Sequence, residues 1–319
     1  METLETYTDH PVEFLWLELT NRCNLQCVHC YANSGPYGSN SVLTTADFRG
    51  LIQEAAELGC RQVQFIGGEP TLDPALPELI EHAHHCGMDF LEIYTNGRRL
   101  SESLLTCLAA FEVNVAVSFY SIDPGMHDLI TQTPGSHRDT LANLRRIINA
   151  GINLRVGVIE MAENRSTISE TVEYLLGLGI ANVGVDGARK FGRAISGDRC
   201  AATDIQELCG SCWRGSLCIH PDGTASPCIM SKQWSVGSLS NSSLTDLAHS
   251  NSLREIRDRI YREVWLPKAE AVPSGATPTL CTPNWNKPCS PECTPTCHPR
   301  CSPSCSPCYP FGRCRPQTG

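Results

Sequence analysis

The chain has 319 residues, a formal net charge of −9 at pH 7 and 41% hydrophobic residues. That length allows two domains or one large domain with an appendage, and the acidic balance, with no long Lys/Arg run, argues against a nucleic-acid partner held through its phosphates. The polar start is not a signal peptide and no stretch approaches the roughly 18 apolar residues of a membrane span, so we expect a cytoplasmic protein with no membrane partner.

Cysteine usage sets the chain apart, since 19 residues are cysteine. Disulfides are a poor default without a secretory signal, and metal or cluster ligation is the better explanation. Cys60, Cys86 and Cys107 are scattered along helical patterns and are expected to be small buried hydrophobes. The other cysteines gather within 23–30, 200–228 and 281–314.

Apolar strand-like runs alternate with helical patterns over the first two thirds of the chain. Strands are predicted at 13–20, 62–68, 89–96, 114–121, 153–161 and 182–187, and helices at 44–59, 75–87, 101–111, 137–151 and 166–179. Thr44 and Ser166 are the expected N-caps of two of these helices. The alternation predicts an α/β fold, an open partial (β/α)6 TIM-like barrel over 13–195 preceded by a tail at 1–12, with ligands at the C-terminal ends of the strands.

The character changes after the barrel. Residues 196–265 are predicted to form a small Cys-rich domain with a hairpin in "LCIHPDGTASPC", because the PDG sequence favours a turn. Residues 266–319 are predicted to be a Pro/Ala/Gly-rich linker and a tail whose eight cysteines all stand in Cys-x-Pro units. Such a tail cannot build an apolar core.

The stretch "TNRCNLQCVHCY" carries Cys23, Cys27 and Cys30 directly after the first predicted strand. A structural zinc site would lack a ligand here, and buried cysteines would have no reason to cluster. Three thiolates can instead hold three irons of a [4Fe–4S] cluster and leave the fourth iron open to another ligand. An open metal position usually means chemistry.

This Cys-x3-Cys-x2-Cys pattern resembles the radical S-adenosylmethionine (SAM) superfamily. "GGEP" at 67–70 is similar to that family's SAM-binding segment, and "YTNG" at 94–97 matches a further strand-end position. The resemblance covers about 13 to 240. It implies that SAM chelates the open iron and is cleaved reductively to a 5′-deoxyadenosyl radical, which removes a hydrogen from the substrate.

The resemblance also implies roles for single residues. Gly67 and Gly68 would let the backbone approach SAM closely, Glu69 would accept a hydrogen bond from the SAM ammonium, and Pro70 would fix the turn. The alternative for this segment is a plain tight turn.

Weaker cofactor contacts are expected elsewhere at the strand ends. His29 stands where the family often has an aromatic residue and is expected to flank the adenine. Asn96 and Ser118 are either ligand contacts or turn residues. Asp186, Arg189 and Arg193 follow the last predicted strand and are either substrate or SAM contacts or a solvated, salt-bridged loop.

The second cysteine group resembles the auxiliary-cluster extension called SPASM, or its shorter twitch form. Its cysteines are Cys209, Cys212, Cys218 and Cys228, and Gly223 precedes the last of them by the family spacing. The resemblance implies at least one auxiliary [4Fe–4S] cluster, on which Cys209 or Cys212 would pair with Cys228. The alternative is a small zinc knuckle.

The tail matches only part of the full SPASM pattern. Cys305, Cys308 and Cys314 have the spacing of its next three ligands, and the rest of the pattern is missing. One or two auxiliary clusters therefore remain open, as do zinc binding, a structural wrap and a thiol hydrogen donor as roles for the tail.

The resemblance favours an enzyme that matures a ribosomally made peptide by crosslinking or epimerisation. The first 12 residues leave no room for a leader-binding domain, so a separate leader-binding protein is expected, with a flavodoxin- or ferredoxin-type electron donor. The alternative is an epimerase or dehydrogenase of a small aminoglycoside or aminocyclitol. A non-catalytic electron carrier would not need an open iron or a GGEP segment.

Overall fold

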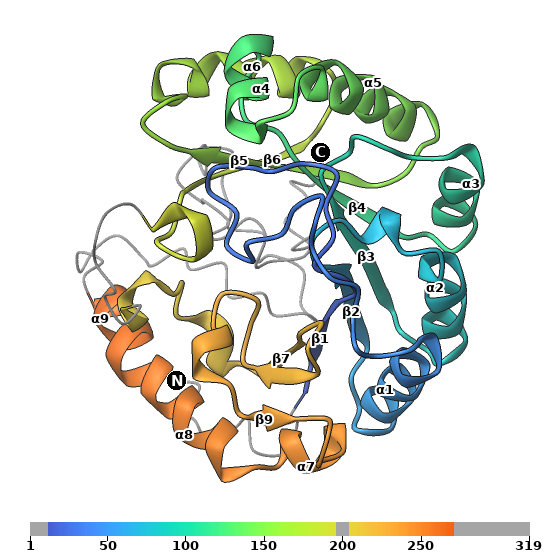
Figure 1. Ribbon diagram of the computed structural model, residues 1–319, viewed down its shortest axis with the longest axis vertical. Coiled ribbons are helices and arrows are strands. Elements are labelled where there is room, and N and C mark those ends of the chain that lie inside the picture. Colours follow the sequence, from blue (N-terminus) through green and yellow to red (C-terminus); the bar gives the residue numbers. More distant parts are fainter. Residues whose placement is uncertain (1–11, 196–203, 271–319) are drawn as a thin grey trace, which may run out of the picture.

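The computed structural model describes residues 12–195 and 204–270, and its strands form one continuous sheet (Figure 1). The strands are β1 (Phe14–Glu18), β2 (Gln62–Ile66), β3 (Phe90–Thr95), β4 (Asn114–Ser118), β5 (Leu154–Glu160), β6 (Asn182–Gly187), β7 (Ser216–Ile219), β8 (Thr224–Ser226) and β9 (Gly237–Ser238). Their spatial order is β6-β5-β4-β3-β2-β1-β7-β8-β9. Pairing is parallel from β6 to β7 and antiparallel beyond, which confirms the open α/β barrel.

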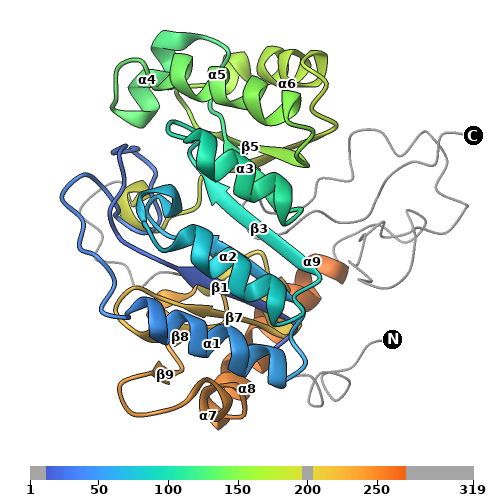
Figure 2. The ribbon, with the colours of Figure 1, turned by 90° about the vertical axis from the view of Figure 1, so that its right-hand side faces the viewer.

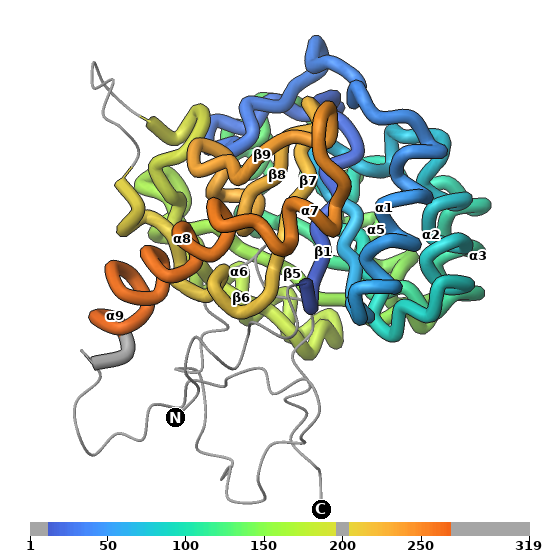
Figure 3. Tube along the Cα trace, turned by 90° about the horizontal axis from the view of Figure 1, so that it is seen from below, coloured from blue at the N-terminus to red at the C-terminus, as the bar shows by residue number. Residues whose placement is uncertain are grey.

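Helices cover the outer side of this curved sheet (Figures 1 and 2). They are α1 (Thr45–Glu57), α2 (Leu76–His85), α3 (Glu102–Ala110), α4 (Pro124–Thr131), α5 (Ser136–Asn149), α6 (Ile168–Gly177), α7 (Leu244–Ala248), α8 (Asn251–Ile260) and α9 (Leu266–Glu270). The last three follow the β7–β9 end of the sheet (Figure 3). Among the described residues, no helix is both long and apolar enough to cross a bilayer.

Local signals placed most barrel helices correctly. Thr44 caps α1 in a capping box with Asp47, as predicted. Ser166 is not an N-cap, because α6 begins two residues later after a 3₁₀ turn and Thr167 occupies the cap without a side-chain hydrogen bond. The sequence prediction also missed α4, although Asp123 caps it and Pro124 opens it.

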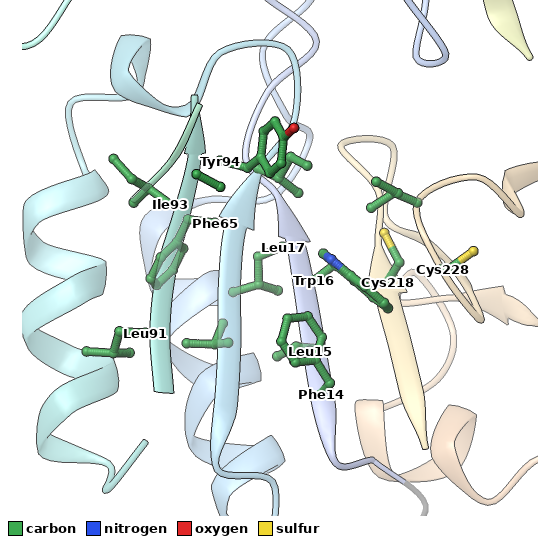
Figure 4. Packing of buried hydrophobic residues seen from close by; sticks show 14 of the residues in the cluster. Phe14, Leu15, Trp16, Leu17, Phe65, Leu91, Ile93, Tyr94, Cys218 and Cys228 are labelled. Carbon is green, nitrogen blue, oxygen red and sulfur yellow. The ribbon is translucent and has the colours of Figure 1, made fainter. Parts of the chain in front are cut away.

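The Cys-rich segment continues the barrel sheet. β7 pairs in parallel with β1, so that Trp16 lies opposite Cys218 (Figure 4). Cys212 and Cys228 belong to the same hydrophobic core as the barrel strands. The second cysteine group is therefore held on the edge of the barrel by β-pairing and shared packing.

A buried polar group lies within the barrel. Leu91 and Ile93 point to one side of β3 (Figure 4). Glu92 stands between them in the strand and therefore faces the other side of the sheet. Its carboxylate accepts two hydrogen bonds from Arg155, at 2.9 and 2.8 Å, and a third from Gln64. Because both charged partners are buried, the pair must stay intact for the barrel to remain stable.

Candidate active site

The first cysteine loop, which we define as residues 19–44, connects β1 to α1. Its backbone is fixed by other segments: Gln26 and Val28 donate N–H bonds to the carbonyls of Thr131 and Ile130, at 3.1 and 2.9 Å. These carbonyls belong to the last turn of α4. The helix that the sequence prediction missed is thus one of the supports of the predicted iron site.

The three thiols of this loop lie close enough to influence one another. Burial, with Glu69 and the other two thiols adding to it, raises the pKa of Cys23 far above its usual range. Burial and Cys30 raise the pKa of Cys27 to about 12. Metal ligands must be deprotonated, so a cation bound here would displace protons that the buried thiols otherwise keep. The set suits a metal cluster and not free thiolates.

Gly67 and Gly68 permit β2 to end against the first cysteine loop. A Cβ on Gly67, whose φ is +132°, would lie 2.7 Å from the Thr20 carbonyl oxygen, and one on Gly68 would overlap that of Arg22. The Gly68 and Glu69 amides donate to these same carbonyls at 2.6 and 2.8 Å. The missing Cβ atoms, which were predicted to let SAM come close, therefore let the first cysteine loop come close to the end of β2.

Glu69 connects the ends of β2 and β3. Its side chain is 1% exposed, and the carboxylate accepts hydrogen bonds from the Thr71 hydroxyl at 2.7 Å and its N–H at 3.1 Å, the Thr95 hydroxyl at 2.6 Å and the Asn96 N–H at 2.8 Å. Burial raises the pKa of this carboxyl although these donors oppose the rise. Three of these donors meet Oε1 and one meets Oε2, so the carboxylate joins the ends of β2 and β3 and Oε2 keeps a position that can accept a further hydrogen bond. The contact with the SAM ammonium stays a prediction. Pro70 opens the short helix η2 (Pro70–Leu72), which places it in a turn.

Asn96 and Ser118 are both connected to the first cysteine loop. The Asn96 side-chain amide donates to the Asn24 side-chain oxygen Oδ1 at 2.7 Å and approaches the Cys23 sulfur at 3.5 Å. Ser118 donates to the Tyr94 hydroxyl at 3.4 Å. Ser118 also forms a hydrogen bond with Tyr120, whose hydroxyl lies 4.0 Å from the Cys27 sulfur. The structure therefore brings Asn96 directly to the first cysteine loop and Ser118 to it through Tyr120.

His29 and Arg193 lie together against the same loop. The His29 ring packs edge-on to Tyr120 at 4.9 Å, and burial, followed by the Arg193 charge, lowers its pKa to about 4. Arg193 donates from Nε to the Cys27 carbonyl at 2.7 Å and from its N–H to the Cys30 carbonyl at 3.0 Å. This second contact requires Gly192, at φ +55°, where a Cβ would overlap the Cys30 carbonyl oxygen.

Asp186 and Arg189 match the salt-bridged alternative. Their side chains are 2.9 Å apart, and Arg189 also donates to the Glu207 carbonyl at 3.0 Å. The Asp186 carboxylate further accepts the Gly187 N–H at 2.9 Å. This pair joins β6 to the segment before the second cysteine group.

Polar atoms without partners lie in the first cysteine loop and beside it. Asn24 Nδ2, His29 Nδ1 and Arg193 Nη2 are buried and have no hydrogen-bond partner among the described residues. Buried polar atoms are nearly always paired, so orphaned ones indicate a ligand or water. Their position beside three thiols fits a polar molecule bound next to a metal cluster.

The second cysteine site, which we define as Cys209, Cys212 and Cys228, is compact. The Cys212 thiol forms hydrogen bonds with both other thiols, and these, with burial, raise its pKa well above the usual range. Cys212 therefore contacts both Cys209 and Cys228, and the choice of the thiol that would share a cluster with Cys228 stays a prediction. Cys218 points elsewhere, with its sulfur 3.8 Å from His220 Nδ1.

A buried cation near this site was not anticipated from the sequence. Arg257 on α8 donates to the Ser216 carbonyl at 2.9 Å. Burial lowers its pKa to about 10, and the nearby Cys212 thiol opposes that shift. A cation here would favour thiolates at the second cysteine site. Cys305, Cys308 and Cys314 lie outside the described residues.

Comparisons with known proteins agree with this geometry. The family model of the radical SAM superfamily matches residues 17–175, and that of SPASM, an iron–sulfur cluster-binding domain, matches 209–271. The chain belongs to the radical SAM superfamily. It carries a SPASM domain on the same sheet.

Among curated relatives, PqqA peptide cyclase of Bradyrhizobium diazoefficiens is 28% identical over 60% of this chain and 50% of its own length. Mycofactocin maturase MftC of Mycobacterium tuberculosis is 33% identical over 53% of this chain and 43% of its own length. The chain therefore spans about half the length of these relatives, or less.

A solved structure supports the fold. Streptococcus suis SuiB bound to S-adenosylmethionine superposes with a TM-score of 0.62 at 14% identity, covering 79% of this chain and 70% of SuiB. SuiB has also been crystallised with its precursor peptide SuiA.

Proposed function

We propose that this protein is a radical SAM enzyme that matures a ribosomally synthesised peptide. The observation that carries the proposal is the first cysteine loop: three neighbouring thiols at the C-terminal edge of the sheet, with orphaned polar atoms beside them. An enzyme needs this open arrangement, whereas an electron carrier would close the cluster with a fourth protein ligand.

Cys23, Cys27 and Cys30 would hold a [4Fe–4S] cluster with one open iron, where SAM binds. When bound, the cluster would supply an electron and SAM would supply a cleavable S–C5′ bond. Together they would be the source of hydrogen abstraction. Asn96, His29 and Arg193 fit the polar and ring contacts of such a ligand, because each lies against the cysteine loop. His29 would be neutral at pH 7 and so adds no charge beside the cationic sulfonium.

Cys209, Cys212 and Cys228 would hold an auxiliary iron–sulfur cluster. All three are assembled, and the site is mostly buried, as suits an electron store next to the substrate space. The described residues provide three thiols here, and a fourth ligand would come from substrate or from the part of the chain outside the description. Zinc is the alternative occupant.

A peptide is the favoured substrate class. PqqA peptide cyclase and mycofactocin maturase are among the relatives, and SuiB binds a precursor peptide. The peptides with which these proteins are named favour a peptide substrate for this chain over an aminoglycoside. We propose crosslinking or epimerisation as the outcome, in the cytoplasm, with a flavodoxin- or ferredoxin-type electron donor and a separate leader-binding protein.

The test is to reconstitute the clusters, add SAM and a reductant, and measure 5′-deoxyadenosine by mass spectrometry. We expect 5′-deoxyadenosine from the native chain and none from Cys27→Ala. Intact clusters with no 5′-deoxyadenosine above background would overturn the proposal. Incubation with candidate peptides in deuterated water then separates the outcomes: deuterium uptake without loss of two hydrogens means epimerisation, and loss of two means crosslinking or oxidation.

A further inference from the structure

A chain of buried hydrogen bonds runs from the first cysteine loop to the second cysteine site. The Tyr31 hydroxyl donates to Glu18 Oε1 at 2.8 Å, and Glu18 Oε2 lies 2.7 Å from His220 Nδ1. His220 Nε2 lies 2.7 Å from Ser226 Oγ, which donates to the Cys228 carbonyl at 2.8 Å. We name these four side chains the buried relay.

The buried relay connects two places that matter for the proposed function. Tyr31 directly follows Cys30, and the far end of the relay is the carbonyl of Cys228 itself. The buried relay crosses from β1 to the β7–β8 hairpin, where the Cys-rich segment joins the barrel.

The interior of the buried relay has no access to water. Glu18 is 3% exposed, and His220 and Ser226 are 0% exposed. A buried polar group that loses its partner keeps its full desolvation cost. If a hydrogen bond at either end of the relay is lost, water cannot replace the lost partner, and the geometry of the neighbouring hydrogen bond must change.

Counting hydrogens shows that the relay has little freedom. The single Ser226 hydroxyl hydrogen goes to the Cys228 carbonyl, which can only accept, so His220 Nε2 must carry a hydrogen and donate to Ser226. One further proton is then shared between His220 Nδ1 and Glu18 Oε2. A metal ion held by Glu18, Cys218 and His220, whose ligand atoms lie within 4.8 Å of one another, would have to displace that proton and break this bond.

We propose that the buried relay couples the two cysteine sites: Glu18 and His220 are positioning residues that hold Cys228 in place according to the state of the loop carrying Cys30. The inference rests on the proposed function only in taking both sites as cluster sites. Because coupling between sites is reciprocal, filling one site should change the affinity of the other, and by the same factor in both directions.

The test uses the full chain without metal and follows one cysteine at a time. Native-state alkylation by iodoacetamide, resolved by mass spectrometry, gives the exposure rate of Cys228 with buried Cys60 as an internal reference. Tyr31→Phe removes only the first hydroxyl of the relay. We expect it to raise the alkylation rate of Cys228 about tenfold and to leave Cys60 unchanged.

The matched control is Tyr120→Phe, which removes another buried tyrosine hydroxyl beside the first cysteine loop, 4.0 Å from the Cys27 sulfur and outside the relay. It should leave Cys228 unchanged. Ser226→Ala cuts the far end, and in that background Tyr31→Phe should add no further effect, because contacting networks are non-additive. Independent, multiplying effects, or a Tyr31→Phe effect confined to Cys30 and its neighbours, would overturn the coupling.

Two His220 variants keep the test decisive if Ser226→Ala does not fold. The amide nitrogen of His220→Asn can replace Nδ1 and keep the Glu18 half of the relay, whereas that of His220→Gln can replace Nε2 and keep the Ser226 half. Cys228 should be more exposed in the Asn variant. Equal exposure in both would contradict the relay. Since the assay needs no cluster, a failure of SAM cleavage and a failure of the coupling give different results.

In the reconstituted protein, a second readout is the rate at which a chelator removes iron from the second cysteine site. Tyr31→Phe should speed this loss, although Tyr31 lies in the other loop. A rate equal to that of the native chain would argue against reciprocity between the sites.

Discussion

The two cysteine sites lie on one sheet and are built in opposite ways. The first cysteine loop is an irregular connection whose backbone is held by β2, by the end of α4 and by Arg193. The second site is held mainly by its own contacts, because the Cys212 thiol forms hydrogen bonds with both other thiols and the site packs into the common core, with the buried relay ending on the Cys228 carbonyl. The first site therefore depends on contacts from elsewhere in the chain, whereas the second is stabilised mainly by its own burial.

This difference has a chemical reason. A catalytic metal site must leave a coordination position accessible and yet keep its ligands fixed. The first loop meets both needs with main-chain hydrogen bonds behind the cysteines and orphaned polar atoms beside them. Changes in the supports should therefore damage the first site much more than the second, which they reach only through the buried relay.

The largest effect is expected from Gly68→Ala. Its Cβ would overlap the Arg22 carbonyl oxygen, and backbone atoms cannot move aside as a flexible side chain can. We expect loss of iron from the first site and a drop of about 100-fold or more in 5′-deoxyadenosine formation, a change of about 2.7 kcal/mol in transition-state stabilisation. Iron at the second cysteine site should remain.

Gly50→Ala is the matched control for Gly68→Ala. A Cβ on Gly50, within α1, meets nothing within 4 Å, and alanine is the better helix former. Iron content and SAM cleavage should match those of the native chain. Normal SAM cleavage by Gly68→Ala would show that the close packing of β2 on the loop is not required.

The next largest effect is expected from breaking the buried Glu92–Arg155 pair, and it should affect both cysteine sites. Arg155→Met leaves Glu92 as a buried, uncompensated carboxylate, and such losses cost about 3–5 kcal/mol. We expect urea denaturation to show a free energy of unfolding lower by that amount, with both sites losing iron in parallel. Arg165→Met, in an exposed pair with Glu160, is the control and should cost about 1 kcal/mol or less.

Much of the first site could be predicted because its signals are local. Cys23, Cys27 and Cys30 fall within eight consecutive residues. The glycines of GGEP follow a strand that the hydrophobic pattern predicts. The parallel sheet followed from alternation, which fixes topology without knowledge of contacts. The capping box at Thr44 is likewise a short-range pattern.

The rest depended on pairing between distant residues. Glu18 and His220 are 202 positions apart and meet only because β7 pairs with β1. Glu69 was predicted to contact SAM from its place in GGEP, and that contact stays a prediction, whereas its burial among donors at the end of β3 could not be predicted from its sequence neighbours. The spacing of residues along the chain predicts neither the pairing of β7 with β1 nor the direction in which the Glu69 carboxylate points.

Acid should weaken the wall of the first site through His127. Its ring packs 5.3 Å from that of Tyr120, and burial, with His137 adding to it, lowers its pKa to about 4, below the ordinary value of 6.5. The neutral ring therefore stabilises the fold fully above pH 6.5, and this contribution is lost as the pH falls toward 4. The loss is up to about 3 kcal/mol.

Urea denaturation at pH 7, 6 and 5 checks this dependence. His127→Gln removes the titration at similar size, so the variant should lose less stability than the native chain between pH 7 and pH 5. His29 shifts in the same direction and remains in both proteins, so the comparison isolates His127. Parallel pH profiles for the two proteins would mean that His127 already titrates normally in the fold.

The smallest effect should come from Arg193→Met. The change removes the hydrogen bond from Nε to the Cys27 carbonyl and keeps the backbone bond to Cys30, so the local cost should be about 1–2 kcal/mol. A chelator should remove iron from the first site about tenfold faster, which corresponds to about 1.4 kcal/mol, and the rate at the second site should change much less, because the change reaches that site only through the buried relay. Arg193→Lys keeps a donor of similar length and should restore part of the difference. Equal acceleration at both sites would mean that Arg193 supports the whole barrel edge, and the contrast between an externally held site and a self-supporting one would then fail at this residue.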